Sequence, residues 1–221
     1  MIKYLGSKRV LLPHILATVR PLPDVSSVLD LFSGTSRVAQ TFKRARYRVH
    51  ANDHNAYAAT LARCYAGVDS RRRLASAERV ISELDTLPGS AGWFTDTYCV
   101  RSRFFRPEND ARIEAIRERI AWLALEPALE AVALTGLLEA DDRVDSTTCV
   151  QMAYLKLWAP RAPRPCGLRV TERAIEHRSY IGHQIWIYDG KGRKVGTPNA
   201  SHNREHLFLV ELEPAVAARR H

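Results

Sequence analysis

One stretch decides the fold of this chain: Val28-Leu29-Asp30-Leu31-Phe32-Ser33-Gly34-Thr35-Ser36-Arg37-Val38. The apolar run at residues 27–31 is typical of a buried parallel strand, and Gly34 allows the backbone to turn sharply after it. The spacing predicts a helix over residues 37–44 and a second strand over residues 47–51. Strand, glycine turn, helix and strand in this order indicate the beginning of a doubly wound α/β sheet.

Asp53 supports a ligand site at the end of this sheet. It follows Gly34 at about the 20 residues that separate a glycine turn from a ribose-binding carboxylate in such folds. Ser36 stands where a dinucleotide fingerprint requires glycine, so that fingerprint is not met. Taken one at a time, the glycine turn also fits an ordinary strand-to-helix connection, and Asp53 fits a solvated residue at a strand end.

The chain opens on a crowded basic segment, Lys3-Tyr4-Leu5-Gly6-Ser7-Lys8-Arg9. A lysine and backbone amides close to a helix N-terminus suit a carboxylate ligand, and a flexible basic start is the alternative explanation. A short helix is expected to follow over residues 10–19, with Pro13 tolerated in its first turn.

The chain is basic, with 33 Lys and Arg residues against 24 Asp and Glu and a formal net charge of +9. This excess favours a polyanionic partner, because neutralised phosphates release counterions, although an arginine-rich composition bias gives the same balance.

The four cysteines are scattered, which argues against disulfides or a zinc site and favours reduced thiols in the cytosol. The most apolar stretch, residues 121–138, contains Glu126, Pro127 and Glu130 and predicts a buried helix pair, so no membrane span is expected.

The middle of the chain is predicted to be helical, and strands return near its end. Apolar residues at helical spacing predict helices over residues 56–66, 71–87, 110–125 and 127–138. Asn109 or Asp110 is the expected N-cap of the third helix. The proline-rich residues 159–165 predict a stiff, extended boundary, and residues 184–188 and 205–212 predict an antiparallel hairpin.

The two N-terminal motifs together resemble the alpha-type adenine-N6 DNA methyltransferases, which methylate adenine within short duplex sites. The resemblance rests on Lys3-Tyr4-x-Gly6-Ser7-Lys8-Arg9 and on Asp30-Leu31-Phe32-Ser33-Gly34-Thr35. It implies S-adenosylmethionine as the cofactor. By the same resemblance, the methionine end is assigned to Tyr4 and Lys8, the loop to Asp30, Phe32 and Gly34, and the ribose to Asp53.

The resemblance continues through the helical middle, in Tyr98-x-x-Arg101-x-Arg103-Phe104-Phe105-x-x-x-Asn109-x-x-Arg112-Ile113 and again from Leu138 to Pro160. There the family carries its DNA-recognition insert, and arginines around two phenylalanines suit duplex phosphates. The alternative is a solvated helix face with both phenylalanines in the core. The residues assigned to DNA are Arg101, Arg103, Arg106, Arg112, Arg143, Thr147, Thr148 and Lys156.

The implied fold is an α/β, Rossmann-like methyltransferase sheet, incomplete, with an inserted helical DNA-recognition lobe and a C-terminal antiparallel hairpin. Residues 1–55 and 174–221 would form the cofactor-binding core, and residues 56–165 the lobe. No further parallel strand is predicted between Pro165 and Tyr180, so helix surfaces would be left uncovered. We therefore expect low stability, aggregation or a second chain that completes the fold.

The family's catalytic loop, an Asp/Asn-Pro-Pro-Tyr/Phe tetrad that receives the flipped adenine, occurs nowhere in the 221 residues. No catalytic residue is therefore assigned. The expected function is a site-specific adenine-N6 DNA methyltransferase of the restriction-modification type, internally shortened, impaired or inactive alone, and acting on duplex DNA. The expected location is the cytoplasm, in association with the nucleoid, for a protein of bacterial or phage type. The alternatives are a non-catalytic DNA- or S-adenosylmethionine-binding remnant and an unrelated nucleotide-binding α/β protein.

Overall fold

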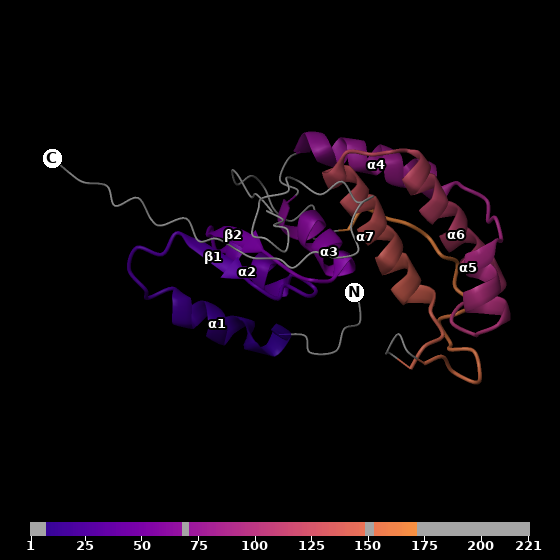
Figure 1. Ribbon diagram of the computed structural model, residues 1–221, viewed down its shortest axis with the longest axis horizontal. Helices are drawn as coiled ribbons and strands as arrows, with labels where there is room; N and C mark the ends of the chain where they lie inside the picture. Colours follow the sequence, from indigo (N-terminus) through magenta and orange to yellow (C-terminus); the bar gives the residue numbers. More distant parts are fainter. Residues whose placement is uncertain (1–7, 68–70, 149–152, 172–221) are drawn as a thin grey trace.

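The computed structural model describes residues 8–67, 71–148 and 153–171 of the chain (Figure 1). Strands β1 (Ser27–Asp30) and β2 (Arg48–Ala51) pair in parallel, with Asp30 opposite Ala51. Helix α2 (Arg37–Arg44) connects them. The predicted unit of strand, glycine turn, helix and strand is confirmed, with each strand one residue shorter than predicted, and in the described part of the chain the sheet has these two strands.

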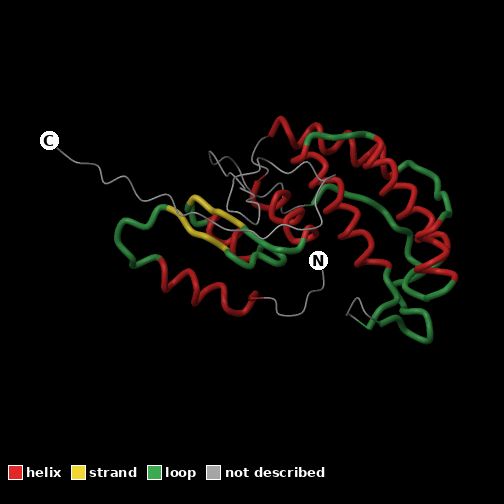
Figure 2. Tube along the Cα trace, in the orientation of Figure 1, coloured by secondary structure: helices red, strands yellow, loops and turns green. Residues whose placement is uncertain are grey.

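Helices cover the sheet and form the first core with it. A 3-10 turn, η1 (Lys8–Leu11), leads into α1 (Leu12–Val19), and Figure 2 shows α1 as a separate helix below the two strands. Helix α3 (Ala56–Gly67) follows β2. The buried side chains of this core are small or aromatic: Val38, Ala39, Phe42, Val49, Ala51, Ala62 and Ala66.

The second part of the molecule is a helical assembly around α7 (Pro127–Val144). Helices α4 (Arg71–Asp85) and α6 (Pro107–Trp122) pack against α7 and bury a stripe of isoleucine and leucine side chains between them. A short helix, α5 (Trp93–Thr95), continues into the π turn η2 (Asp96–Val100) ahead of α6.

Helix α3 joins the two parts because it buries side chains in both. Ala62 and Ala66 belong to the core of the sheet, whereas Leu61, Cys64 and Tyr65 pack against α4 and α7. Figure 1 shows α3 between the strands and α7. The limits 1–55 and 56–165 of the core and the lobe stay a prediction, and the predicted C-terminal hairpin lies outside the described residues.

The predicted limits of several helices were wrong. Helix α1 starts two residues later than predicted and α4 ends two residues earlier, and the limits of α6 and α7 differ more. Helix α6 starts at Pro107, three residues before the predicted start, and Arg106 is its N-cap with an extended backbone. Proline suits this first position because its missing N–H would have no partner there. Asn109 and Asp110 are therefore inside the helix and buried, at 4% and 0% exposed. Helix α7 also runs on to Val144.

The proline-rich segment, predicted to be extended, forms turns instead. The Ala162 N–H donates to the Ala159 carbonyl at 2.9 Å. From α6, the Asn109 Nδ2 donates to the carbonyls of Ala162 and Arg164 at 2.9 and 2.8 Å, and its Oδ1 accepts the Cys166 N–H at 2.9 Å. Proline is as compatible with a turn as with an extended chain, and one asparagine side chain stabilises the turned form.

The chain then crosses α7 in close contact. A Cβ at Gly136 would lie 3.1 Å from the Ile81 Cδ1 and 3.2 Å from the Arg169 carbonyl oxygen, so a side chain there would push these neighbours away by a few tenths of an ångström. Cys166 and Leu168 are buried in the core of the helical part. Residues 166–171 are therefore an integral piece of that core.

Two carboxyl groups are buried between α6 and α7. Neither oxygen of Asp110 has a hydrogen-bond partner among the described residues, and one oxygen of Asp141 also lacks one. Burial raises the pKa of Asp110 to about 7, and the nearby Glu114 carboxylate adds to the rise. Burial also raises the pKa of Asp141 well above its usual value, with Asp110 adding and Arg143 opposing. Folding therefore favours the protonated forms of the Asp110 and Asp141 carboxyl groups.

We predict that Asp110→Asn stabilises the protein in a pH-dependent way. The pKa of Asp110 is higher in the folded than in the unfolded chain, so folded wild-type protein keeps a proton that the unfolded chain loses, and stability falls as pH rises from about 4 to about 7. Asparagine removes this loss, and the free energy of unfolding in urea should rise by roughly 4 kcal/mol at pH 8 and little at pH 4. Glu118→Gln, on the exposed side of α6, is the control. An equal effect of Asp110→Asn at both pH values would contradict the prediction.

Candidate cofactor cradle and nucleic-acid interface

The loop between β1 and α2 is the centre of the first candidate site. Gly34 and Ser36 both have left-handed backbones, with φ of 49° and 56°. Glycine adopts this conformation at no steric cost, whereas Ser36 carries a Cβ and is strained there. The Ser36 N–H donates to the Ser33 carbonyl at 2.7 Å, which makes the loop a tight turn.

Asp30 ends β1 beneath this loop and caps the next helix. Its Oδ2 accepts the Ala39 N–H in the first turn of α2 at 3.1 Å, whereas the side chain of Ser36, the N-cap residue, makes no capping bond. Asp30 is 6% exposed, and burial raises its pKa, while the Lys8 ammonium and the Ala39 N–H act in the opposite direction. The carboxyl therefore positions α2 and leaves a partly balanced negative charge below the loop.

Asp53 and Asn52 fasten the loop to the end of β2. The Asp53 Oδ2 accepts the Gly34 N–H at 2.8 Å, and its Oδ1 accepts the Asn55 N–H at 2.9 Å. The Asn52 carbonyl accepts the Ser33 N–H at 2.9 Å, and its Nδ2 donates to the Leu31 carbonyl at 3.0 Å. A carboxylate offers about four acceptor positions, so Asp53 can still accept bonds from a hydroxyl-bearing ligand. Sequence reasoning missed Asn52, although it directly precedes Asp53.

Lys8 and Phe32 complete the arrangement. The Lys8 Nζ donates to the Phe32 carbonyl at 3.0 Å, and the Phe32 ring is 70% exposed. The structure therefore brings Lys8, Asp30, Phe32, Gly34 and Asp53 together around one loop, as the sequence predicted. Tyr4 lies outside the described residues.

Buried polar atoms beside the loop lack partners. Within the described part of the chain, no hydrogen bond reaches the hydroxyls of Ser33 and Ser36 or the Nε2 of Gln40. Such atoms are normally bonded in folded proteins, and an exception calls for a ligand, a water or a functional role. The loop thus has the hydrogen-bonding capacity to hold a polar ligand. We refer to residues 31–36 with Lys8, Asp30 and Asp53 as the cofactor cradle.

The second candidate site lies where the residues after η2 meet residues 153–158. Arg101 is an exposed side chain paired with Asp96 at 2.7 Å. The guanidinium carbons of Arg103 and Arg106 lie 4.7 and 5.4 Å from the ring centroid of Trp158, and Arg103 also donates to the Lys156 carbonyl. We call the group Arg101, Arg103, Arg106, Lys156 and Trp158 the arginine–tryptophan patch.

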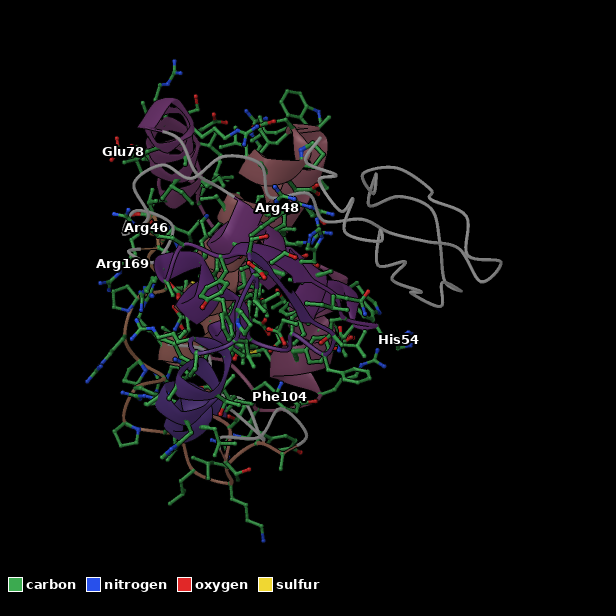
Figure 3. The ribbon with its side chains drawn as sticks, turned by 90° about the vertical axis from the view of Figure 1, so that its left-hand side faces the viewer. Arg46, Arg48, His54, Glu78, Phe104 and Arg169 are labelled. Atoms are coloured by element: carbon green, nitrogen blue, oxygen red, sulfur yellow. The ribbon has the colours of Figure 1, made fainter. Side chains whose placement is uncertain are left out.

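Aromatic rings connect this patch to α5. Ring centroids lie 6.2 Å apart for Trp93 and Tyr98, 5.9 Å for Tyr98 and Phe104, and 5.3 Å for Phe104 and Tyr154. Phe105 instead packs on the core of the helical part, so only one of the two phenylalanines lies in the core. In Figure 3, Phe104 lies in the lower half of the view, and Glu78 on α4 lies near the top.

Arg112 and Arg143, expected to contact DNA, bond within the protein. Arg112 donates from Nε to the Cys166 carbonyl at 3.0 Å, from Nη1 to the Leu87 carbonyl at 3.0 Å and from Nη2 to Asp85. The Arg143 Nη2 donates to the Gly167 carbonyl at 2.6 Å. Because these donors hold the segment that crosses α7, we leave both arginines out of the proposed DNA surface.

The two threonines have different surroundings. Thr147 is 7% exposed, and its hydroxyl donates to Asp145, which also pairs with Arg161 at 2.5 Å. Thr147 forms an isolated antiparallel bridge with Tyr154, so it belongs to the base of the loop. Thr148 is exposed, next to residues 149–152, which lie outside the described part. Thr148 therefore stays in the proposed DNA surface, and Thr147 supports it.

No cluster of His, Cys, Asp and Glu side chains able to hold a metal ion occurs among the described residues. In the same part of the chain, every helix is too short or too polar to cross a membrane.

Comparisons with known proteins agree with this geometry. The family model for D12 class N6 adenine-specific DNA methyltransferases matches residues 4–169. The chain is 32% identical over 168 residues to the type II methyltransferase M.NlaIII of Neisseria lactamica, which covers 72% of this chain and 49% of that protein. It is 27% identical over 176 residues to the modification methylase StsI of Streptococcus sanguinis. This alignment covers 72% of this chain and 27% of that protein.

The chain therefore spans about half the length of one curated relative and about a quarter of the other. No solved structure matches it significantly. The family match runs through both the cofactor cradle and the arginine–tryptophan patch, and it confirms the resemblance seen in the N-terminal motifs. The chain belongs to the D12 class of N6 adenine-specific DNA methyltransferases.

Proposed function

We propose that this chain binds S-adenosylmethionine in the cofactor cradle and duplex DNA at the arginine–tryptophan patch, in the cytoplasm, and that it transfers no methyl group on its own. The observation that carries the proposal is the bond from the Gly34 N–H to Asp53, which joins the glycine loop to a carboxylate at the end of β2. In α/β sheets, ligands bind outside the carboxyl ends of the strands, where this bond lies.

The residues of the cradle fit S-adenosylmethionine. Asp53 would accept bonds from the ribose hydroxyls, and the Lys8 ammonium, which has three donors, would pair with the methionine carboxylate. The unpartnered hydroxyls of Ser33 and Ser36 give further polar contacts. When bound, the cofactor supplies an activated methyl group on its sulfonium sulfur.

Charge and exposure support DNA as the substrate. The net charge of +9 favours a polyanion, and the exposed Arg101 and Lys156 with the half-buried Arg103 and Arg106 give the patch positive charge that suits phosphates. Thr148, at the edge of the same loop, adds a hydroxyl for phosphate or base edges. The structure supports this smaller set, without Arg112 and Arg143, because Arg112 bonds inside the fold from all three of its nitrogens and the half-buried Arg143 bonds the Gly167 carbonyl.

The missing tetrad limits what the chain can do alone. The adenine amino group needs acceptors that hold it in line with the methyl group, and the family's Pro-Pro loop supplies them. The carbonyls of Ser26 and Asp30 bond toward β2, so by alternation the polar backbone groups of Leu29 point away from it and are oriented to pair with a further strand. We propose that a second chain with the tetrad pairs at this edge.

We predict that Asp53→Asn weakens binding of S-adenosylmethionine by about 10-fold or more, because hydrogen bonds to a charged group contribute roughly 1.5–3 kcal/mol. Isothermal calorimetry measures the dissociation constant. Asp24→Asn, in the exposed turn before β1, is the matched control and should bind like the wild-type chain. Tight binding by Asp53→Asn, or binding of NAD in place of S-adenosylmethionine by the wild-type chain, would contradict the cofactor assignment.

We also predict that the chain, incubated with tritiated S-adenosylmethionine and adenine-containing duplex DNA, transfers no label, because no residue receives the adenine amino group. Addition of a relative that carries the tetrad but lacks a working cofactor cradle should restore transfer. Turnover by the chain alone would show that another residue replaces the tetrad. Binding of both ligands with no restoration would favour the non-catalytic alternative.

A further inference from the structure

Trp158 contacts two of the arginines proposed for DNA. The Arg103 and Arg106 guanidinium carbons lie 4.7 and 5.4 Å from its ring centroid, within the range of cation–π attraction. The family resemblance assigned both arginines to DNA but gave no role to this tryptophan. Because the ring is flat and rigid, it restricts where the two charges can lie.

The ring itself is fixed to the fold by its neighbours. Ala159 is 1% exposed, and its N–H donates to the Ser146 Oγ at 3.0 Å. Ser146, just after α7, donates its N–H to the Phe104 carbonyl at 2.7 Å and accepts the Leu155 N–H at 2.8 Å. Both segments of the patch therefore meet at one residue, and Trp158 stands on a rigid base.

The spacing of the two arginines suits one DNA strand. Because the two guanidinium carbons lie 4.7 and 5.4 Å from the same centroid, they are at most about 10 Å apart. Successive phosphates of one strand, which follow each other every ~3.4 Å along the helix axis, fall within this limit, so the two charges can face neighbouring phosphates. Arg103 uses one donor on the Lys156 carbonyl, and a guanidinium has five.

We infer that Trp158 is a positioning residue that holds Arg103 and Arg106 as a pair against successive phosphates of one DNA strand. The inference rests on the proposed DNA binding. In a general basic patch each charge contributes to DNA binding by itself. Here the contribution of the two arginines to DNA binding depends on an uncharged ring.

The chain contains a matched control at the other end of α6. There Arg119 stacks on Trp122 at 4.1 Å, but its side chain also pairs with Glu83 at 2.6 Å. Trp122 is 70% exposed, so replacing it also removes a surface tryptophan that holds an arginine. Like Trp158→Ala, Trp122→Ala therefore removes a tryptophan that stacks on an arginine, but Trp122 lies outside the arginine–tryptophan patch.

The test is the salt dependence of binding to a fluorescent, adenine-containing duplex, measured by anisotropy between 50 and 200 mM KCl. Each lost phosphate contact lowers the slope of log K against log salt by about 0.9. Arg103→Ala and Arg106→Ala should each show this loss. Trp158→Ala keeps both charges but should lower the slope by at least about 1 and weaken binding about 10-fold. Trp158→Phe should restore most of the slope.

The decisive comparison is Trp158→Ala in the Arg103→Ala, Arg106→Ala background, where it should have no further effect. Trp158→Leu keeps an apolar side chain and should lose the slope as Trp158→Ala does, so it replaces that variant if alanine prevents folding. A slope for Trp158→Ala or Trp158→Leu equal to that of Trp122→Ala would overturn the inference. Failure of the wild-type chain to bind the duplex would instead overturn the proposed function.

Discussion

The hydrogen bond between the Gly34 amide and the Asp53 carboxylate is the contact on which the proposed cofactor site depends. It joins the loop after the first strand to the end of the second at 2.8 Å, and the Asn52 side chain and carbonyl add two more bonds to the same loop. Because the strands are parallel, their carboxyl ends meet at one edge, and residues far apart in sequence close around one turn. Asp30, below the turn, sets the start of the following helix.

In the helical part, polar side chains stabilise the fold by bonding backbone groups that are distant in the sequence. Asn109 and Arg112 on α6 together bond backbone groups of residues 162–166, and Arg112 also bonds the end of α4. Each such bond contributes about 1 kcal/mol net, and removal of a donor leaves buried carbonyls unsatisfied. The same helix begins beside the arginine–tryptophan patch, so the internal bonds also fix the base of the proposed DNA surface.

Local patterns predicted the sheet part well. The apolar run, Gly34 and the spacing to Asp53 each depend on a few neighbouring residues, so the strands and α2 were predicted correctly, and the structure brings the residues from Lys8 to Asp53 together around one loop. The helical part was harder because its decisive contacts are distant in sequence. Asn109 has the residue type of an N-cap, and nothing nearby shows that it bonds Cys166, 57 positions later. Arg112 matches a DNA-binding motif, yet it bonds a carbonyl 54 positions away. Trp158 lay within the matched motif, but its contact with two arginines is visible only in three dimensions.

The cradle can be tested most directly through its own amides. In ¹⁵N NMR spectra of the wild-type chain, titration with S-adenosylhomocysteine, a methyl-free analogue of the cofactor, reports on the Gly34 and Asn55 N–H groups that bond Asp53. We predict saturable shifts of both signals, because a ribose hydroxyl on the same carboxylate changes these hydrogen bonds. Unchanged Gly34 and Asn55 signals at saturation, or shifts confined to the helical part, would contradict the cofactor site.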